Sequence, residues 1–502
     1  MPLAKAYTAA VLGLEAFPVE VEADISNGLP SFSIVGLPDK AIEESKERVR
    51  AAIRNSGADF PTKRITVNLA PADIKKEGPS YDLAIALAIL AADGQIPQID
   101  KKNLLVGELA LNGSLRRING ILPIVTALNK HFDQIILPDI NKEEASLVKN
   151  MSIIPVDNLK NLIFYFKKEK ELPNYSGAVK VQSTKVFECD ISEIKGQEQA
   201  KRALEIAAAG GHNLLFNGPP GSGKTLLART IPTILPMLTE EEMIEVTKIY
   251  SVAGLLAQDK PIIDERPFRA PHHTTSSVAL VGGGTYPRPG EITLSHRGVL
   301  FLDEFPEFPR SVLEALRQPL EDGIITVSRA QGSLIFPAKF ILVAAQNPCP
   351  CGYWGDKHKH CICSPTQIMR YQKRVSGPLL DRIDLHIEVP RLEYEKLTEA
   401  QSGETSQQIR ARVEKAREIQ LKRMGKTNSE MSPKQIREYC RVTPEAKEIL
   451  KSAVNSLHLS ARQFTRILKV SRTIADLACS ERIERDHLAE ALQFRAKEKE
   501  IY

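Results

Sequence analysis

Three segments near the N-terminus alternate apolar and polar positions, as half-buried strands do. They are VEVEADI at 19–25, SFSIVGL at 31–37 and RITVNLA at 64–70. Helical patterns occupy 39–55 and 81–92, and the second is almost entirely aliphatic, which predicts burial on most of its sides. We therefore expect residues 1–166 to form one α+β domain. A polar stretch with Pro and Gly follows and predicts a linker at 167–185.

Apolar strands and helical patterns alternate from 186 to 395, where NLLFNG, VLFLDE, FILVAA and DLHIEV are the predicted strands. Such alternation predicts an α/β domain built on a parallel sheet. Strand patterns are absent from 396–502, so this part is predicted to be a small helical domain. Its expected helices are 405–425, 432–455, 460–480 and 484–498.

Composition fits a multidomain globular protein, since 42% of the 502 residues are hydrophobic and 26% are charged. The net charge of +5 neither requires nor excludes a nucleic-acid partner.

The longest apolar run, 83–92, is too short to span a bilayer, and Glu15 interrupts the first apolar stretch, so no membrane segment or signal peptide is expected. Seven cysteines do not suggest a disulfide scaffold. We expect a soluble, cytoplasmic protein.

A phosphate-binding loop is predicted where GPPGSGKT fits the spacing G-x-x-x-x-G-K-[ST] between a predicted strand and a helix. Glycines let backbone N–H groups surround phosphates, and the helix N-terminus adds partial positive charge. Lys224 is expected to contact the β- and γ-phosphates, and the Thr225 hydroxyl to bind Mg²⁺. The alternative is a glycine-rich turn that only begins a helix. The expected nucleotide-binding residues are Gly218, Pro219, Pro220, Gly221, Ser222, Gly223, Lys224 and Thr225.

A second candidate motif is GVLFLDE at 298–304, an apolar strand that ends in two carboxylates. In a phosphate-loop enzyme, Asp303 is expected to hold Mg²⁺ through its water shell and Glu304 to polarise the attacking water. A buried strand ending in an acidic turn is the alternative. Beside a phosphate loop, we favour the catalytic interpretation.

Four further segments carry a family resemblance: PGEITLSHRGVLFLDEFPEF at 289–308, VAAQNPCPCGYWGD at 343–356, GPLLDRIDLHIEV at 377–389 and SARQFTRILKVSRTIADLA at 460–478. With GPPGSGKT, they make the chain resemble the magnesium-chelatase-like branch of AAA+ ATPases, the ComM/YifB family, over essentially its whole length. The resemblance implies ATP hydrolysis with Mg²⁺ by a homo-oligomeric, hexameric ring.

The same resemblance implies roles for three more residues. Asn347 matches the sensor that orients the hydrolytic water, although it can instead cap a strand end. Arg382 matches the arginine finger that reaches the γ-phosphate of the neighbouring subunit, unless it pairs with Asp381 or Asp384. Arg462 matches the lid arginine that contacts nucleotide in its own subunit, with Arg466 as the alternative.

Thr225 and Asp303 are separated by about eighty residues, more than a strand crossover requires. This interval contains a Gly- and Pro-rich segment at 266–296 that resembles the pore-facing insertion of the branch. A hairpin is predicted at 324–340 with its tip near Arg329–Gly332. Hairpins of related ring helicases contact DNA phosphates, so we expect a DNA contact here, against the alternative of a merely solvated tip.

Four of the seven cysteines cluster at Cys349, Cys351, Cys361 and Cys363. Four thiolates suit a tetrahedral, structural Zn²⁺ site, although C-x-C pairs are less specific than C-x-x-C pairs. His358 and His360 lie between the pairs and can substitute as ligands. Four reduced thiols on a loop are the alternative.

The N-terminal segments KEGPSYDLAIALA at 76–88 and LLVGELALNGSLRRINGILPIVTAL at 104–128 resemble the proteolytic domain of Lon-type proteases, a fold related to ribosomal protein S5. Ser80 matches the position of the nucleophile, but Leu122 or Pro123 stands where the activating lysine is expected. Without that base we expect no peptidase activity, and we expect Ser80 to cap the buried helix.

These motifs are compatible with three functions. Family resemblance favours a motor that acts on single-stranded or branched DNA, in branch migration during recombination and natural transformation. A chelatase motor that drives metal insertion with a partner subunit is the alternative; such motors lack the Lon-like N-terminal domain. An ATP-dependent Lon-like protease is disfavoured by the missing lysine.

Overall fold

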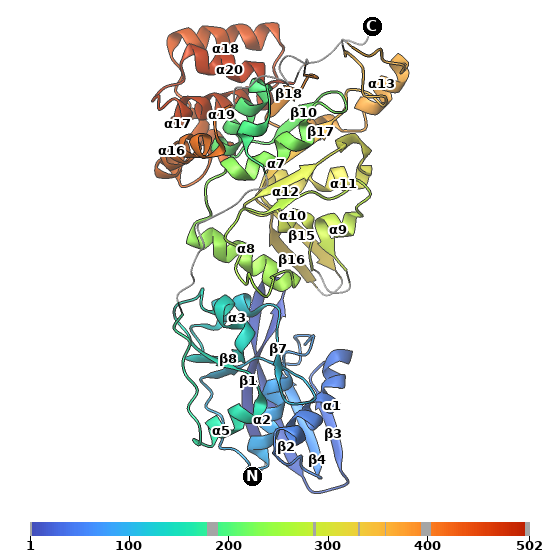
Figure 1. The fold of residues 1–502 in the computed structure, drawn as a ribbon, viewed down its shortest axis with the longest axis vertical. Coiled ribbons are helices and arrows are strands. Elements are labelled where there is room, and N and C mark those ends of the chain that lie inside the picture. The colour runs from blue at the N-terminus through green and yellow to red at the C-terminus, as the bar shows by residue number, and fades with distance from the viewer. Residues whose placement is uncertain are drawn as a thin grey trace. The chain divides into compact units, whose positions relative to one another are not determined.

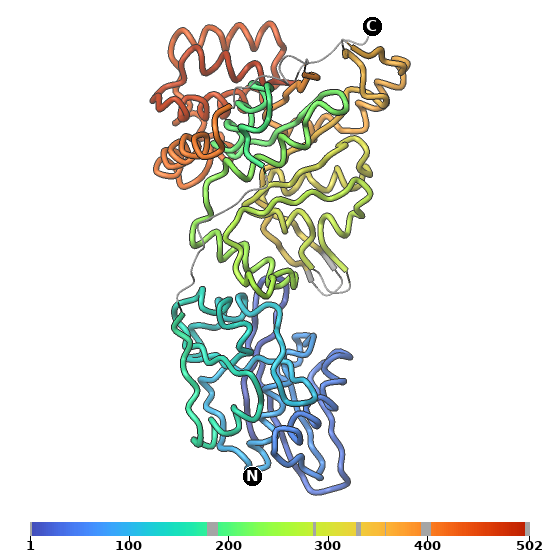
Figure 2. Tube along the Cα trace, in the orientation of Figure 1, coloured from blue at the N-terminus to red at the C-terminus, as the bar shows by residue number. Residues whose placement is uncertain are grey.

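The computed structural model describes residues 3–177, 189–284, 288–329, 332–356, 358–392 and 403–496, without the side chains of Ser328 and Arg329. The chain separates into two compact units. One comprises Met1–Gln182 together with Glu240–Asp264, and the other comprises Ser183–Thr239 with Glu265–Tyr502. In Figures 1 and 2 the N-terminal part of the first unit is blue to cyan, and the second unit runs from green to red.

The first unit contains a seven-stranded mixed sheet in the order β3-β4-β2-β1-β5-β8-β9. Its first two strands form a long antiparallel hairpin, in which Leu12 pairs with Glu15 across a turn at Gly13. The predicted strands at 19–25, 31–37 and 64–70 are found in this sheet. The strands are β1 (Leu3–Leu12), β2 (Glu15–Ser26), β3 (Ser31–Val35), β4 (Arg64–Ala70), β5 (Asn103–Leu105), β8 (Gln134–Pro138) and β9 (Ser152–Val156).

Helix α2 (Asp82–Ala92) forms the centre of the first unit, because all its residues from Asp82 to Ala91 are buried. It packs on β1 and β2, as its uniformly apolar sequence predicts. The expected capping role of Ser80 is wrong: Tyr81 occupies the N-cap position, and no side chain caps this helix. The other helices are α1 (Lys40–Asn55), α3 (Ile121–Leu128), α4 (Lys142–Ala145) and α5 (Leu159–Phe166), with short strands β6 (Glu108–Leu109) and β7 (Leu115–Arg116).

Helix α8 (Glu240–Ala253) packs on α3 and belongs to the first unit, although its residues lie inside the range 186–395 expected for the ATPase domain. Ser251 anchors it: its Oγ accepts from the backbone N–H of Gly120 at 2.9 Å and donates to the buried carboxylate of Glu144. The backbone N–H of Leu122 also donates to Glu144, at 2.9 Å. The two units therefore differ from the predicted division at this segment, and the second unit contains the predicted α/β and C-terminal helical domains together.

The second unit is built on a parallel sheet of five strands in the order β11-β14-β17-β10-β18. The four strands predicted for this part of the chain are all present, and β11 is an additional short edge strand. Their bounds are β10 (Leu214–Asn217), β11 (Phe268–Arg269), β14 (Val299–Leu302), β17 (Ile341–Gln346) and β18 (Leu385–Glu388). The expected combination of a parallel α/β sheet with a helical C-terminal region is confirmed.

Helices and two hairpins complete this α/β part. The helices are α6 (Glu198–Gly210), α7 (Lys224–Ile234), α9 (Ser277–Val281), α10 (Glu291–Leu294), α11 (Arg310–Ala315), α12 (Arg317–Asp322), α13 (Pro365–Gln372) and α14 (Gly377–Leu380). The hairpins pair β12 (Gly282–Gly283) with β13 (Arg288–Pro289) and β15 (Ile324–Arg329) with β16 (Gly332–Pro337).

The C-terminal region consists of helices α16 (Ser406–Met424), α17 (Pro433–Tyr439), α18 (Pro444–Ser456), α19 (Ala461–Leu477) and α20 (Arg485–Gln493). Capping boxes at Thr405, Ser432, Ser460 and Glu484 begin four of them. The single helix expected at 432–455 is instead two, because Pro444 lacks an N–H and fits best in a first helical turn. The chain leaves α17 at Cys440, and Thr443 caps α18.

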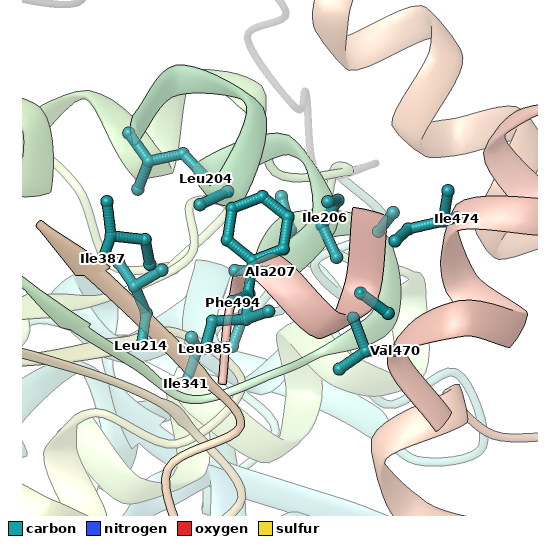
Figure 3. Packing of buried hydrophobic residues seen from close by; sticks show 14 of the residues in the cluster. Leu204, Ile206, Ala207, Leu214, Ile341, Leu385, Ile387, Val470, Ile474 and Phe494 are labelled. Atoms are coloured by element: carbon teal, nitrogen blue, oxygen red, sulfur yellow. The ribbon is translucent and has the colours of Figure 1, made fainter. Parts of the chain in front are cut away.

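One hydrophobic core joins the parallel sheet to the C-terminal helices (Figure 3). Leu204 and Ala207 of α6, Leu214 and Leu385 of the sheet, and Ile474 of α19 belong to this one cluster. Phe494, just beyond α20, is 2% exposed in the same cluster. The strand that leads to the phosphate loop is therefore packed in the same core as the C-terminal helices. Among the described residues, no helix has both the length and the apolar composition that crossing a membrane requires.

Candidate nucleotide-binding site

The glycine-rich loop 218–225 joins the end of β10 to the start of α7. Gly221 and Gly223 have φ angles of +75° and +88°, which favour glycine. Gly218 is required for another reason, because a Cβ there would lie 2.1 Å from the carbonyl oxygen of Val389. The buried Oγ of Ser222 has no hydrogen-bond partner in the described part of the chain. A loop with free polar groups before a helix N-terminus suits phosphate binding.

Lys224, the first residue of α7, turns its ammonium group back across this loop. Its Nζ donates to the carbonyl oxygens of Gly218 at 2.7 Å and Pro219 at 2.9 Å, and to Oδ1 of Asn347 at 3.2 Å. Burial lowers the pKa of Lys224 to about 8, although the negative charge of Asp303 acts against the shift. All three hydrogen-bond partners are neutral, so an anionic ligand would stabilise this cation.

Thr225 and Asp303 meet beside the loop, where Oγ1 of Thr225 donates to Oδ2 of Asp303 at 2.7 Å. The other carboxylate oxygen of Asp303 accepts from the backbone N–H of Glu304 at 2.9 Å. A hydroxyl beside a carboxylate is an all-oxygen donor set of the kind that Mg²⁺ binds next to phosphates. The residues present therefore fit the implied ion.

Glu304 lies just beyond β14 in a left-handed backbone conformation, with φ of +52°. Its Oε2 lies 3.1 Å from Nδ1 of His273. The ring of His273 also packs at 4.1 Å from that of His272 and meets Phe308 edge-on. His273 was not a candidate from the sequence, since no motif spacing links it to Glu304.

Asn347 follows directly after β17, whose carboxyl end lies beside that of β10 in the sheet. The hydrogen bond from Lys224 to Asn347 thus links the phosphate loop to the neighbouring strand end. Lys224, Thr225, Asp303, Glu304 and Asn347 come from the carboxyl ends of three adjacent parallel strands. Ligand sites of open α/β sheets lie at this edge.

The two remaining arginine candidates have different surroundings. Arg382 pairs with Glu321 and donates to the carbonyl oxygen of Pro378 at 2.6 Å, so its ion-pair partner is neither Asp381 nor Asp384. Arg462 is exposed at the start of α19. Arg466 is directed elsewhere: its Nη1 donates to the carbonyl oxygen of Ile383 at 3.1 Å, and its Nε lies 3.7 Å from Asp384.

The predicted hairpin is present as β15 and β16, paired in register from Ile324–Pro337 to Arg329–Gly332. One face is buried through Ile325, Val327 and Phe336. Residues 330 and 331 and the side chain of Arg329 lie outside the described part of the structure. In the Gly- and Pro-rich segment, residues 285–287 are likewise outside it.

The four clustered cysteines converge on one point. Their sulfur atoms all lie within 4.8 Å of one another, and those of Cys349, Cys351 and Cys361 are separated by 3.4 to 3.6 Å. Zn–S bonds of about 2.3 Å place the sulfurs of a tetrahedral site about 3.8 Å apart, whereas a disulfide requires about 2.05 Å. His358 and His360 are exposed and are not part of the group.

Backbone N–H groups also face these sulfurs, as around metal-bound thiolates. Trp354 donates to Cys349 at 3.3 Å, and Cys363 donates to Cys361 at 3.4 Å. The donor set, its spacing and this outer hydrogen bonding fit a four-sulfur zinc site.

Comparison with known proteins gives three family matches along the chain. "Subunit ChlI of Mg-chelatase" matches residues 21–141, "Magnesium chelatase, subunit ChlI" matches 190–397, and "Magnesium chelatase, subunit ChlI C-terminal" matches 403–495. The competence protein ComM of Haemophilus influenzae is 48% identical, over 99% of this chain and 98% of its own length. YifB of Escherichia coli is 45% identical, over 99% and 97%. The magnesium-chelatase 38 kDa subunit of Cereibacter sphaeroides is 26% identical over only 31% of this chain and 52% of its own.

Proposed function

Because the chain belongs to the magnesium-chelatase-like ComM/YifB family of AAA+ ATPases, we propose that it hydrolyses ATP and uses the energy to act on DNA as a ring-shaped motor. The ATPase proposal rests on one observation, the hydrogen bond from Lys224 to Asn347 next to the Thr225–Asp303 hydrogen bond. These contacts bring together the groups proposed to bind phosphate, hold Mg²⁺ and orient water, which supports the proposal.

In this mechanism the phosphate loop binds the triphosphate, and Lys224 offsets the negative charge of its β- and γ-phosphates. Thr225 and Asp303 would hold the Mg²⁺, whose positive charge would offset the charge that develops on these phosphates. Glu304 accepts the proton of the attacking water, and Asn347 orients that water. His273 holds the Glu304 carboxylate in place, in the manner of a third group that orients a catalytic base.

We propose that the active site is completed by a second copy of the chain. Arg382 would act on the nucleotide of the neighbouring subunit, where a guanidinium stabilises the transition-state charge. Its present partner Glu321 is 58% exposed, whereas the Arg382 side chain is only 18% exposed, so Arg382 would have to leave this pairing and turn outward to reach a neighbouring phosphate. Arg462 would contact nucleotide within its own subunit, for which its exposure leaves it available. The ring would be a hexamer, by the family resemblance.

DNA is the proposed substrate, because one of the relatives that match over nearly their full length is a competence protein, whereas the chelatase subunit matches less than a third of this chain. Branch migration of recombination intermediates in the cytoplasm would be its task. The hairpin β15–β16 and the Gly- and Pro-rich segment are the proposed DNA contacts. The N-terminal unit would have the Lon-like fold without peptidase activity, since Leu122 and Pro123 are both buried in α3.

The deciding experiment measures ATP turnover by the full-length protein with and without single-stranded DNA. We expect DNA to stimulate turnover several-fold, and DNA affinity to fall steeply with salt as phosphate contacts release counterions. Arg329→Ala should weaken DNA binding and flatten its salt dependence, whereas Lys447→Ala on the exposed face of α18 should not. Turnover that DNA leaves unchanged, with no DNA binding by intact rings, would exclude the DNA motor and favour a chelatase-type motor.

A further inference from the structure

The cysteine cluster begins only two residues after Asn347, at the end of the strand that forms the middle of the candidate site. Cys349 is completely buried there, although residues 347–364 contain no helix or strand where the structure describes them. A segment of this kind has little secondary structure or apolar burial to hold one conformation. A cross-link through its four sulfurs is the feature that can fix it.

The loop that contains the four cysteines packs against the phosphate-binding loop. A Cβ built on Gly352, whose φ is +84°, would lie 2.5 Å from Cδ of Pro220. Glycine is therefore required at this point for both backbone conformation and close approach. The same built atom would lie 3.8 Å from Cγ of Asn347, so Gly352 lies close to both Pro220 and Asn347.

A second series of contacts connects the cysteine-containing loop to the phosphate loop. Lys359 and Arg391 both lie over the ring of Tyr353, at 4.1 and 5.9 Å from its centroid. Arg391 follows Pro390, whose carbonyl oxygen accepts from Nε2 of Gln197 at 2.7 Å. That same nitrogen lies 3.4 Å from the carbonyl oxygen of Ser222, in the phosphate loop. The loop is thus linked to the nucleotide site by two independent routes.

We propose that Cys349, Cys351, Cys361 and Cys363 bind one structural Zn²⁺, and that the metal-bound loop positions Asn347 and Pro220 for ATP hydrolysis. Zinc binding releases the thiol protons to solvent and leaves the four-thiolate site negatively charged. Lys359 and Arg391 carry the opposite charge on and beside the same loop. The positioning role rests on the proposed ATPase function, but the metal site does not.

The test uses full-length protein purified without chelators, in which zinc is measured by elemental analysis. We expect one zinc per chain in the parent and in Cys479→Ser, an exposed cysteine outside the cluster. Cys351→Ser and Cys361→Ser should lose most of the zinc and at least about tenfold of the ATP turnover, the scale expected when groups that orient a metal site or its neighbours are removed. A parent that contains no zinc, and takes up none when it is added, would overturn the metal site.

Loss of turnover in these variants can also arise from misfolding, so zinc is removed from the folded parent as well. A thiol-competing chelator is added, removed by desalting, and Mg²⁺ is restored before the assay. Turnover should fall and return when one equivalent of zinc is added back. Zinc loss that leaves turnover unchanged would overturn the positioning role.

A readout that does not depend on hydrolysis separates this inference from the ATPase proposal. Amide hydrogen exchange of residues 218–225 should accelerate when zinc is removed, even if the protein hydrolyses no ATP. Unchanged exchange of the phosphate loop in zinc-free protein would contradict the proposal that the zinc-bound cysteine loop supports the phosphate loop. Faster exchange in a protein without ATP turnover would instead count only against the ATPase proposal.

Discussion

Nδ1 of His273 lies 3.1 Å from Oε2 of Glu304, so a histidine that precedes the acidic strand by a long interval contacts the proposed catalytic base. More than half of the Glu304 side chain is exposed, so its contact with the histidine restricts an otherwise solvated carboxylate. A carboxylate without this contact would sample several rotamers. We predict that His273→Ala lowers kcat about tenfold and leaves the KM for ATP nearly unchanged. His273→Asn, which retains a donor, should recover part of the loss, whereas an equal rise in KM would indicate a role in binding.

Glu304→Gln should abolish hydrolysis but retain nucleotide binding. The amide keeps the shape of the carboxylate but cannot accept a proton, and general-base catalysis contributes roughly 10²–10⁴-fold. Single-turnover hydrolysis and binding of a fluorescent nucleotide measure the two effects separately. The control is Glu307→Gln, in the next turn, where the side chain pairs with Arg374. Parental turnover in Glu304→Gln would mean that another residue is the base.

Arg382→Ala should bind ATP and fail to hydrolyse it. If the arginine acts on a neighbouring subunit, mixing this variant with Glu304→Gln should restore some activity, because some interfaces then combine an intact base with an intact finger. Glu321→Gln serves as the control, since it removes the partner of Arg382 within the same chain but keeps the guanidinium. Absence of rescue at every mixing ratio, with ring assembly confirmed by light scattering, would contradict a shared site.

The lowered pKa of Lys224 predicts that nucleotide affinity depends on pH. Burial lowers its pKa to about 8, so without nucleotide the ammonium loses its proton as the pH rises through that value. Phosphates favour the charged form, and binding above this pH therefore takes up a proton. Affinity for a non-hydrolysable ATP analogue should fall by up to about tenfold per pH unit. Lys224→Arg should bind with little dependence on pH from about 7 to 9.5, because the guanidinium stays charged.

Ser251→Ala should weaken the packing of α8 on the rest of the first unit. The change removes one donor from the buried carboxylate of Glu144 and one acceptor from Gly120. Leaving a buried group unsatisfied costs about 1–3 kcal/mol. Amide exchange across 240–253 should accelerate by one to two orders of magnitude, while Ser146→Ala in the same unit leaves it unchanged. Equal protection in both variants would show that the apolar packing of α8 on α3 suffices.

Local sequence patterns identified those residues of the candidate site that lie in one motif or directly after one strand. Gly218, Lys224 and Thr225 are contiguous with β10 and α7, and Asp303 and Asn347 each follow an apolar strand, so a parallel sheet brings them to the same edge. The cysteines were also found, because their spacing is local. These features depend on backbone geometry that a few neighbouring residues determine.

Contacts between distant segments escaped prediction. His273 reaches Glu304 and Glu321 reaches Arg382 across intervals in which neither periodicity nor spacing carries information. The apolar positions of the helix at 240–253 could pack against any apolar surface. That they pack against α3 is seen only in the tertiary structure. The break before Pro444 was within reach of the sequence, since a proline in a continuous helical pattern favours a new start.

The position of α8 has a consequence for biosynthesis. The ribosome makes residues 183–239, which belong to the second unit, before it reaches the segment that completes the first. At about 5–20 residues per second, the nascent N-terminal unit spends several seconds with the Glu144 side of α3 uncovered. For the same reason, a fragment that stops at residue 182 would expose that surface permanently, and one that starts at residue 183 would carry α8 without its partner. Neither half of this protein can be expressed as a contiguous piece with its native contacts complete.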